Sequence, residues 1–165
     1  MKNENNNTYF SNEALAKFVS AQGKIIEKVI CHLWQNKLNP SEVFEIIDNV
    51  ELLFTDKQKL TIGCNEDGDG LDAIDYNYKM AAAALEKEFE GKIKVYAIDA
   101  STTKMWKDVI GKKLNAVRIS RDGESYLSNA IRLDFENELR EIEVNPLDGI
   151  IIDYFEEEDI YSKIK

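Results

Sequence analysis

The stretch "SRDGESYLSNAIRLDFENELREIEVNPLDGIIIDYF", residues 120–155, decides the fold expected for this chain. Apolar and polar residues alternate through much of it, as they do in strands with one buried face. Asp122-Gly123 and Glu136-Asn137 supply residue types that favour tight hairpin turns, and "NPLDG" at 145–149 makes a third turn. Together with the apolar strand before it, this stretch predicts a four-stranded antiparallel meander.

A similar order of residues occurs earlier in the chain. "GKIIEKV" at 23–29 resembles "GKKLNAV" at 111–117, and each follows an aromatic residue, Phe18 or Trp106, by the same spacing. Both stretches are followed by apolar strands and by an Asp-Gly turn. We therefore expect an internal duplication in which Phe18 and Trp106 occupy equivalent buried sites.

The duplication predicts how the chain is organised. We expect a flexible N-terminus over 1–10, a first α+β repeat over 11–77, a connecting helix and short strand over 78–100, and a second repeat over 101–159. The two repeats are expected to form one compact domain. The fold class predicted from this order is α+β, with antiparallel β-meanders and three or four helices packed on one face.

Capping residues and good helix formers mark the expected helices. Ser11 can cap a helix that ends at Gly23, and Thr102 or Thr103 can cap one through Ile110. "YNYKMAAAALEKEFEGK" at 76–92 is the strongest helix former in the chain, and "IKVYAID" after it reads as a strand. Residues 41–47 are ambiguous: the duplication favours a strand, whereas Asn39, Pro40 and Glu42 favour a short helix, which we prefer.

Composition indicates a globular protein that carries a large negative charge. The 165 residues are 44% hydrophobic and have a formal net charge of −10, although residues 102–121 carry six basic residues and one acid. The negative field makes nucleic acid and anionic membranes poor partners and favours a basic protein partner. With no signal peptide and no long apolar run, we expect a cytoplasmic protein with Cys31 and Cys64 reduced. A homodimer is left open.

Residues 64–75, "CNEDGDGLDAID", match only the first half of a calcium-binding loop. Asn65, Asp67, Asp69 and Gly70 fit the template, but Tyr76 stands where a bidentate glutamate is required. We therefore expect an acidic hairpin turn and no metal or other cofactor. The predicted binding face combines this turn with the acidic run near the C-terminus: Glu66, Asp67, Asp69, Asp72, Glu156, Glu157, Glu158 and Asp159.

No catalytic motif is apparent in the sequence, so no catalytic residue is assigned. His32 is the only histidine, and it neighbours Cys31 on a predicted strand, where adjacent side chains face opposite sides. A pairing of His32 with Cys64 is open, but a structural His32 is the preferred interpretation. An enzyme that uses paired carboxylates and a structural or oligomer-forming protein remain alternatives.

The "W-x4-GK-x5-V" opening at Trp106 to Val117, followed by "L-x-F" and Asp-Gly hairpins, resembles segments of small bacterial proteins of unknown function. Proteins of this kind include immunity proteins of polymorphic toxin systems. The resemblance implies tight binding to a basic toxin domain without catalysis. It carries no individual binding residue over to this chain.

Overall fold

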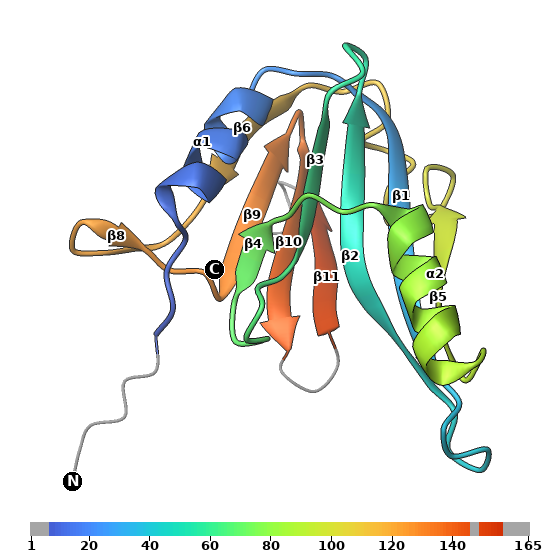
Figure 1. The fold of residues 1–165 in the computed structure, drawn as a ribbon. Helices are drawn as coiled ribbons and strands as arrows, with labels where there is room; N and C mark the ends of the chain where they lie inside the picture. The colour runs from blue at the N-terminus through green and yellow to red at the C-terminus, as the bar shows by residue number, and fades with distance from the viewer. Residues whose placement is uncertain (1–6, 146–148, 157–165) are drawn as a thin grey trace, which may run out of the picture.

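The computed structural model describes residues 7–145 and 149–156, which form a mostly antiparallel β protein with two short helices (Figure 1). The elements are, in chain order, α1 (Asn12–Ala21), β1 (Ile26–Asn36), β2 (Phe44–Phe54), β3 (Lys59–Cys64), β4 (Leu71–Ala73), α2 (Tyr78–Phe89), β5 (Ile93–Asp99), β6 (Leu114–Arg118), β7 (Arg121–Asp122), β8 (Ser125–Tyr126), β9 (Ala130–Phe135), β10 (Glu138–Asn145) and β11 (Gly149–Glu156). Within the described residues, nine strands share one sheet, and β7 and β8 form a separate hairpin.

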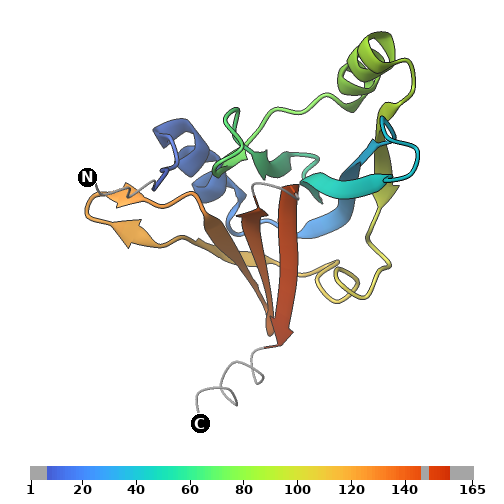
Figure 2. The same ribbon diagram turned by 90° about the horizontal axis from the view of Figure 1, so that it is seen from below.

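The sheet is built from two four-stranded meanders. β1, β2, β3 and β4 pair antiparallel in succession, and so do β6, β9, β10 and β11. A short parallel contact between β11 and β2 joins the meanders, and β5 adds to the free side of β1. The resulting sheet is strongly curled, which is clearest from below (Figure 2).

The two meanders have the same register. Ile26 pairs with Phe54 in the first and Leu114 pairs with Phe135 in the second, and an irregularity follows directly after each pair. The hydrogen bonds that join the two halves of the chain are reciprocal. The Gly23 amide donates to the Leu114 carbonyl at 2.7 Å, and the Gly111 amide donates to the Ile26 carbonyl at 2.8 Å.

Two glycines lie at close contacts between the two halves of the sheet. A Cβ added to Gly70 would be 2.4 Å from the Ser128 hydroxyl, and one added to Gly149 would be 2.4 Å from the Ile47 carbonyl oxygen. Gly70 immediately precedes β4 and Gly149 is the first residue of β11, so each close approach occurs where the last strand of a meander begins. Glycine allows this approach because it has no side chain.

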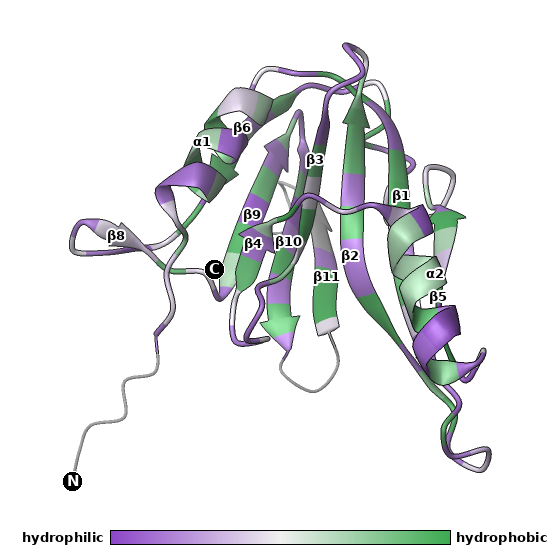
Figure 3. Ribbon diagram, in the orientation of Figure 1, coloured by the Kyte–Doolittle hydropathy of each residue, from purple (hydrophilic) through white to green (hydrophobic). Residues whose placement is uncertain are grey.

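The core fills the space between the curled sheet, α1 and the segment 101–112. Apolar residues alternate along the strands, so that one face of each meander is buried (Figure 3). Phe18 and Trp106 are both buried, with 2% and 1% of their surface exposed. α2, in contrast, has no fully buried residue and packs against β5. Neither described helix is long and apolar enough to cross a membrane.

The expectation of three or four helices packed on one face is wrong, because the described residues contain only α1 and α2. Residues 102–110 form successive turns, in which Trp106 and Val109 donate to carbonyls three residues earlier. Residues 44–47 belong to β2 instead of a helix, and Phe44 and Ile46 pair with β1 residues. At both places, local helix signals are overruled by packing or by cross-strand pairing, which secondary-structure propensity does not include.

Candidate functional site

The acidic turn between β3 and β4 is held by a network of hydrogen bonds. The Asn65 side chain donates to an Asp69 carboxylate oxygen at 2.9 Å and accepts from the Asp69 amide at 3.2 Å. The Asn65 amide donates to the Gly70 carbonyl at 2.8 Å, and the Leu71 amide donates to the Ser128 carbonyl at 2.7 Å. These bonds tie the turn to itself and to the chain just before β9, which gives it a defined conformation.

The carboxylates of this turn differ in their exposure. Glu66, Asp67 and Asp69 are exposed, whereas Asp72 is half-buried in β4 and accepts a hydrogen bond from the Ala73 amide at 2.8 Å. Three of the four predicted residues of the turn are therefore available to a partner.

The N-terminal segment connects the turn with the β7–β8 hairpin. The Thr8 hydroxyl donates to the Asp69 carbonyl at 3.3 Å, and the next residue, Tyr9, donates its hydroxyl to Asp122 at 2.6 Å. Tyr9 is 44% exposed. The hydrogen bond to Asp122 raises the pKa of Tyr9, because the carboxylate disfavours a phenolate beside it.

We call the surface made by Tyr9, Glu66, Asp67, Asp69 and Asp122 the acidic face. Its two parts are linked through the N-terminal segment: Thr8 contacts the β3–β4 turn, and Tyr9 contacts the β7–β8 hairpin. Only part of it was expected from the sequence. Residues 1–10 were expected to be flexible, yet Thr8 and Phe10 form backbone hydrogen bonds with Ser128 and Tyr126.

Of the predicted C-terminal residues, Glu156 is the one that the structure describes, and its position in β11 is remote from this face. Glu156 ends β11 opposite Glu138, at the end of β9 and β10 marked by Phe135. The acidic turn contacts Ser128, before the other end of β9, so roughly 20 Å of extended chain separates the two places. Glu157, Glu158 and Asp159 lie outside the described residues.

The described residues contain no group of three or more His, Cys, Asp or Glu side chains placed to hold a metal ion. In the acidic turn, Asn65 and Asp69 satisfy each other. A calcium ion needs six to eight oxygen ligands directed at one point, which this turn does not offer.

Comparison with models of protein families, with curated proteins and with solved structures gives no match for this chain. The function is therefore inferred from the chemistry of the chain's own residues. Tyr9 and Asp122 were missed at first, although two signals in the sequence pointed to them. "TYF" at 8–10 is an apolar cluster after the asparagine-rich start, and Asp122 lies in a hairpin turn. The hydrogen bond that joins Tyr9 to Asp122 depends on tertiary structure.

His32 is buried in a polar cluster on the outer side of the first meander. Its Nδ1 atom lies 2.7 Å from the Asn49 side-chain oxygen, and Asn49 donates to Asp48 at 2.8 Å. The rings of Tyr76 and Tyr78 lie 4.7 Å and 5.4 Å from the imidazole. The chain that leaves β4 thus covers His32, as expected of a structural histidine with satisfied hydrogen bonds.

Burial favours the neutral forms of Cys31, Cys64 and Tyr76 near this cluster. Burial, with a smaller effect of Asp48, raises the pKa of Cys64, and burial raises the pKa of Cys31 to about 11. The pKa of Tyr76 rises to about 12, mainly through burial and then through Asp48. A nucleophilic cysteine needs a lowered pKa, so neither thiol has the character of a catalytic residue.

Proposed function

We propose that this protein is a non-catalytic protein-binding module whose acidic face meets a basic partner, in the manner of an immunity protein that neutralises a basic toxin domain. The observation that carries the proposal is the acidic face itself. It combines exposed carboxylates on a hydrogen-bonded turn with the exposed ring of Tyr9. The proposal adds Tyr9 and Asp122 to the residues expected from the sequence.

The chemistry of the face supports this role in two ways. A turn that is already ordered loses little conformational freedom on binding, which favours affinity. Exposed charges of one sign attract a basic partner over distance and accelerate its association. Tyrosine is also one of the residue types that most often contribute large binding energies at protein interfaces.

The test compares two variants with equal loss of charge. The first carries Glu66→Gln, Asp67→Asn and Asp69→Asn on the acidic face. The matched control carries Glu86→Gln, Glu88→Gln and Glu90→Gln, which are exposed residues at the end of α2. The partner is a basic protein recovered with the wild-type protein by pull-down, and its association rates are measured at low and at high salt.

We expect the first variant to associate at least about tenfold more slowly at low salt and to lose most of its salt dependence. The control should keep the wild-type rate within about twofold, because its charges lie on another element. Equal effects of the two variants would mean that only net charge matters. An unchanged rate for the first variant would leave the acidic face with solubility as its role.

A second candidate function, a hydrolase that uses carboxylates, is favoured by one observation. Burial and the nearby carboxylates of Glu141 and Asp153 raise the pKa of Glu143. A raised pKa suits a general acid. If Glu143 and Glu141 form a catalytic pair, the wild-type protein should release nitrophenol from a panel of nitrophenyl glycosides. The Glu143→Gln variant should not. We prefer the binding module because Glu141 is already engaged in an ion pair with Arg132 at 3.1 Å.

A further inference from the structure

β5 is an outer strand of the nine-stranded sheet, at the right of Figure 1, with α2 in front of it. It pairs antiparallel with β1 from Ile93 to Asp99, and no described strand pairs with its other side. A strand in this position presents unpaired amides and carbonyls along its free edge, and another strand can pair with them. The free edge of β5 is therefore a candidate interface.

The hydrogen bonds just outside the two ends of β5 show which of its backbone groups face this edge. The Lys37 amide donates to the Lys92 carbonyl at 2.7 Å, and the Ala100 amide donates to the Val29 carbonyl at 2.8 Å. Alternate residues of an antiparallel strand bond to the same neighbour, so the even-numbered residues of β5 bond to β1. The amides and carbonyls that point away from β1 belong to Ile93, Val95, Ala97 and Asp99.

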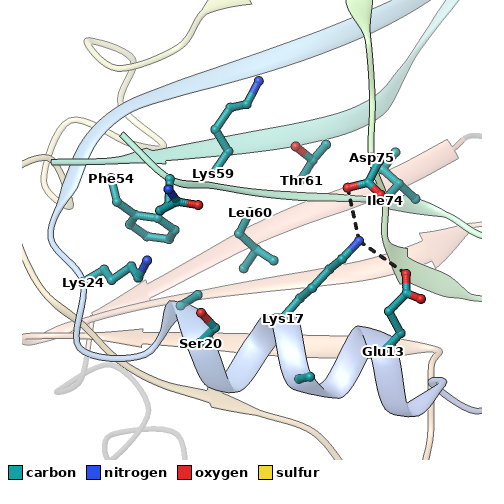
Figure 4. A pocket seen from close by; sticks show the side chains of 13 residues that line it. Glu13, Lys17, Ser20, Lys24, Phe54, Lys59, Leu60, Thr61, Ile74 and Asp75 are labelled. Carbon is teal, nitrogen blue, oxygen red and sulfur yellow. Dashed lines mark hydrogen bonds and ion pairs between the residues drawn. The ribbon is translucent and has the colours of Figure 1, made fainter. Parts of the chain in front are cut away.

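The edge of the sheet at β4 is covered by other parts of the chain. The Leu71 amide donates to the Ser128 carbonyl at 2.7 Å, and the Lys17 ammonium donates to the Ala73 carbonyl at 3.2 Å. Figure 4 shows Lys17 reaching from α1 to Asp75, just after β4. Outward-facing groups at both ends of β4 are thus engaged within the chain.

The edge at β6 is covered as well. The Leu114 amide donates to the Lys24 carbonyl at 2.8 Å, and the Val117 amide donates to the Gln22 side-chain oxygen at 2.8 Å. The chain thereby protects two of the three outer strands that the structure describes. Natural proteins commonly cover strand edges in this way to prevent pairing with other chains.

β5 has no comparable cover among the described residues. The Tyr78 hydroxyl donates to the Val95 carbonyl at 3.4 Å. This distance is longer than that of a good O–H···O hydrogen bond, which is about 2.5–3.0 Å. The edge at β5 is therefore the one that stays open to a partner strand.

We propose that this partner is a second copy of the chain, which pairs antiparallel with β5 through the same edge. The chain has a net charge of −10, but β5 holds one basic and one acidic residue, Lys94 near its start and Asp99 at its end. Two such strands carry no net charge that would repel. In an antiparallel pair, Lys94 of each copy lies near the acidic end of the other, whereas a parallel pair would align like charges.

Symmetry sets the register of the two strands. Tyr96 is the midpoint of the seven residues of β5, so a twofold axis at Tyr96 pairs the whole strand with its copy. Val95 then lies opposite Ala97 of the second copy, and both turn their backbone groups toward each other. Ile93 lies opposite Asp99 in the same way. The two Tyr96 side chains meet at a position without hydrogen bonds between the copies, where side chains are closest and an aromatic pair is favourable.

Side chains around β5 are left partly uncovered in the single chain. Ile98 is 43% exposed, and Met80 on α2 is 70% exposed. In the dimer, Ile98 packs on the aliphatic part of Lys94 of the second copy. Both copies of α2 lie on one face of the combined sheet. The dimer is independent of the proposed function, because the acidic face contains no residue of α2 or β5.

The first test measures the mass of the full chain in solution by sedimentation velocity over a range of concentrations. The wild-type protein should approach twice the 18.9 kDa of one chain. Ala97→Pro should weaken the dimer at least about tenfold, because proline lacks the amide that donates to the second copy. This amide points away from β1, so the pairing within the chain is kept. Ala97→Ser keeps the amide and is the matched control, which should dimerise as the wild type does.

Two results would overturn the proposal directly. One is a wild-type protein that stays monomeric up to millimolar concentration. The other is a dimer that Ala97→Pro leaves unchanged, with thermal melts showing that the variant is folded. A monomeric wild type whose pulled-down partner is lost in Ala97→Pro would assign the edge to that partner, which also overturns the dimer.

Cysteine cross-linking tests the register without relying on Ala97→Pro. In the twofold register, the Cα atoms of the two Tyr96 residues are about 4.5 Å apart, within the range of about 4.4–6.8 Å that a disulfide spans. Tyr96→Cys should therefore link two chains on mild oxidation. Ile98→Cys is the control and should not, because Ile98 lies opposite Lys94, roughly 13 Å along the strand from the other Ile98.

The wild-type protein gives the background of cross-linking from its own cysteines. Cross-linking of Tyr96→Cys well above this background, with Ile98→Cys at background, is the expected result. Equal cross-linking of the two variants, or none in Tyr96→Cys, would overturn the twofold pairing at Tyr96.

Discussion

The Nη2 atom of Arg140 lies 2.9 Å from Oε1 of Glu138, at a place where the Arg140 side chain has no exposure to solvent. The Arg140 guanidinium also donates to the carbonyls of Met105 and Leu139. These contacts fix the segment before β6 against the second meander. A buried charge is tolerable only with a partner of opposite sign and with its hydrogen bonds made.

Replacing Glu138 by Gln should destabilise the protein by about 3 kcal/mol, because it removes the carboxylate charge that lies 2.9 Å from the buried Arg140 guanidinium. The double variant Glu138→Gln with Arg140→Leu should recover much of this loss. Leu60, which pairs with Leu52 in the first meander as Arg140 pairs with Leu133 in the second, is a buried apolar side chain at the corresponding position. Urea unfolding measures both. A loss below about 1 kcal/mol in the single variant would contradict a strongly desolvated pair.

Gly149→Ala should be among the most damaging single substitutions. Gly149 has a φ of 75°, and its added Cβ would meet the Ile47 carbonyl oxygen, a backbone atom that cannot rotate away. We expect a loss of about 3 kcal/mol or more. Gly123→Ala is the matched control: φ is 65° there, but no atom lies within 4 Å of the new Cβ, so only about 1–2 kcal/mol should be lost. Equal losses of stability in the two variants would show that β11 and β2 do not pack closely at Gly149.

Trp106→Ala should cost about 3–5 kcal/mol, because the Trp106 ring is fully buried beneath the second meander. Trp34→Ala is the comparison, since Trp34 is only half-buried and packs on the exposed Phe44 ring. The Trp34→Ala variant should lose less stability than the Trp106→Ala variant. A Trp106→Ala variant of normal stability that no longer binds the partner would instead assign Trp106 to an interface.

Stability should fall as pH rises from about 9 to 11. Burial raises the pKa of Cys31 from 9.0 to about 11, so the folded protein retains a proton that the unfolded chain releases in this interval. A shift of this size corresponds to about 2–3 kcal/mol. Cys31→Ala should flatten the dependence, measured as urea unfolding free energy at several pH values. Tyr76→Phe is a useful second variant, because the pKa of Tyr76 is raised to about 12. An unchanged slope for Cys31→Ala would contradict this assignment.

Calcium should leave the melting temperature unchanged within about a degree at physiological salt. A specific site saturated to 100 times its Kd would add about 2.7 kcal/mol of stability and raise the midpoint by several degrees. Differential scanning calorimetry with calcium and with magnesium at equal ionic strength makes the comparison. A rise with calcium alone would mean that the acidic turn rearranges to bind the ion.

The sequence by itself determined most strands of the second meander and the helix between the halves. The alternation through residues 130–144 appears as β9 and β10, with the turn at Glu136-Asn137 between them, where Asn137 has a φ of 61°. The alanine-rich segment is α2, and "IKVYAID" is β5. These features depend on residues close in the chain, so local pattern and turn chemistry were sufficient.

Only the tertiary structure decided the number of helices and the composition of the acidic face. Residues 102–110 and 41–47 contain helix signals, but burial of Trp106 and pairing of β2 with β1 give other conformations. The acidic face depends on contacts between Thr8 and Asp69, and between Tyr9 and Asp122, which lie far apart in the chain. Local propensity carries no information about such long-range contacts, and the curl of the sheet is what brings these segments together.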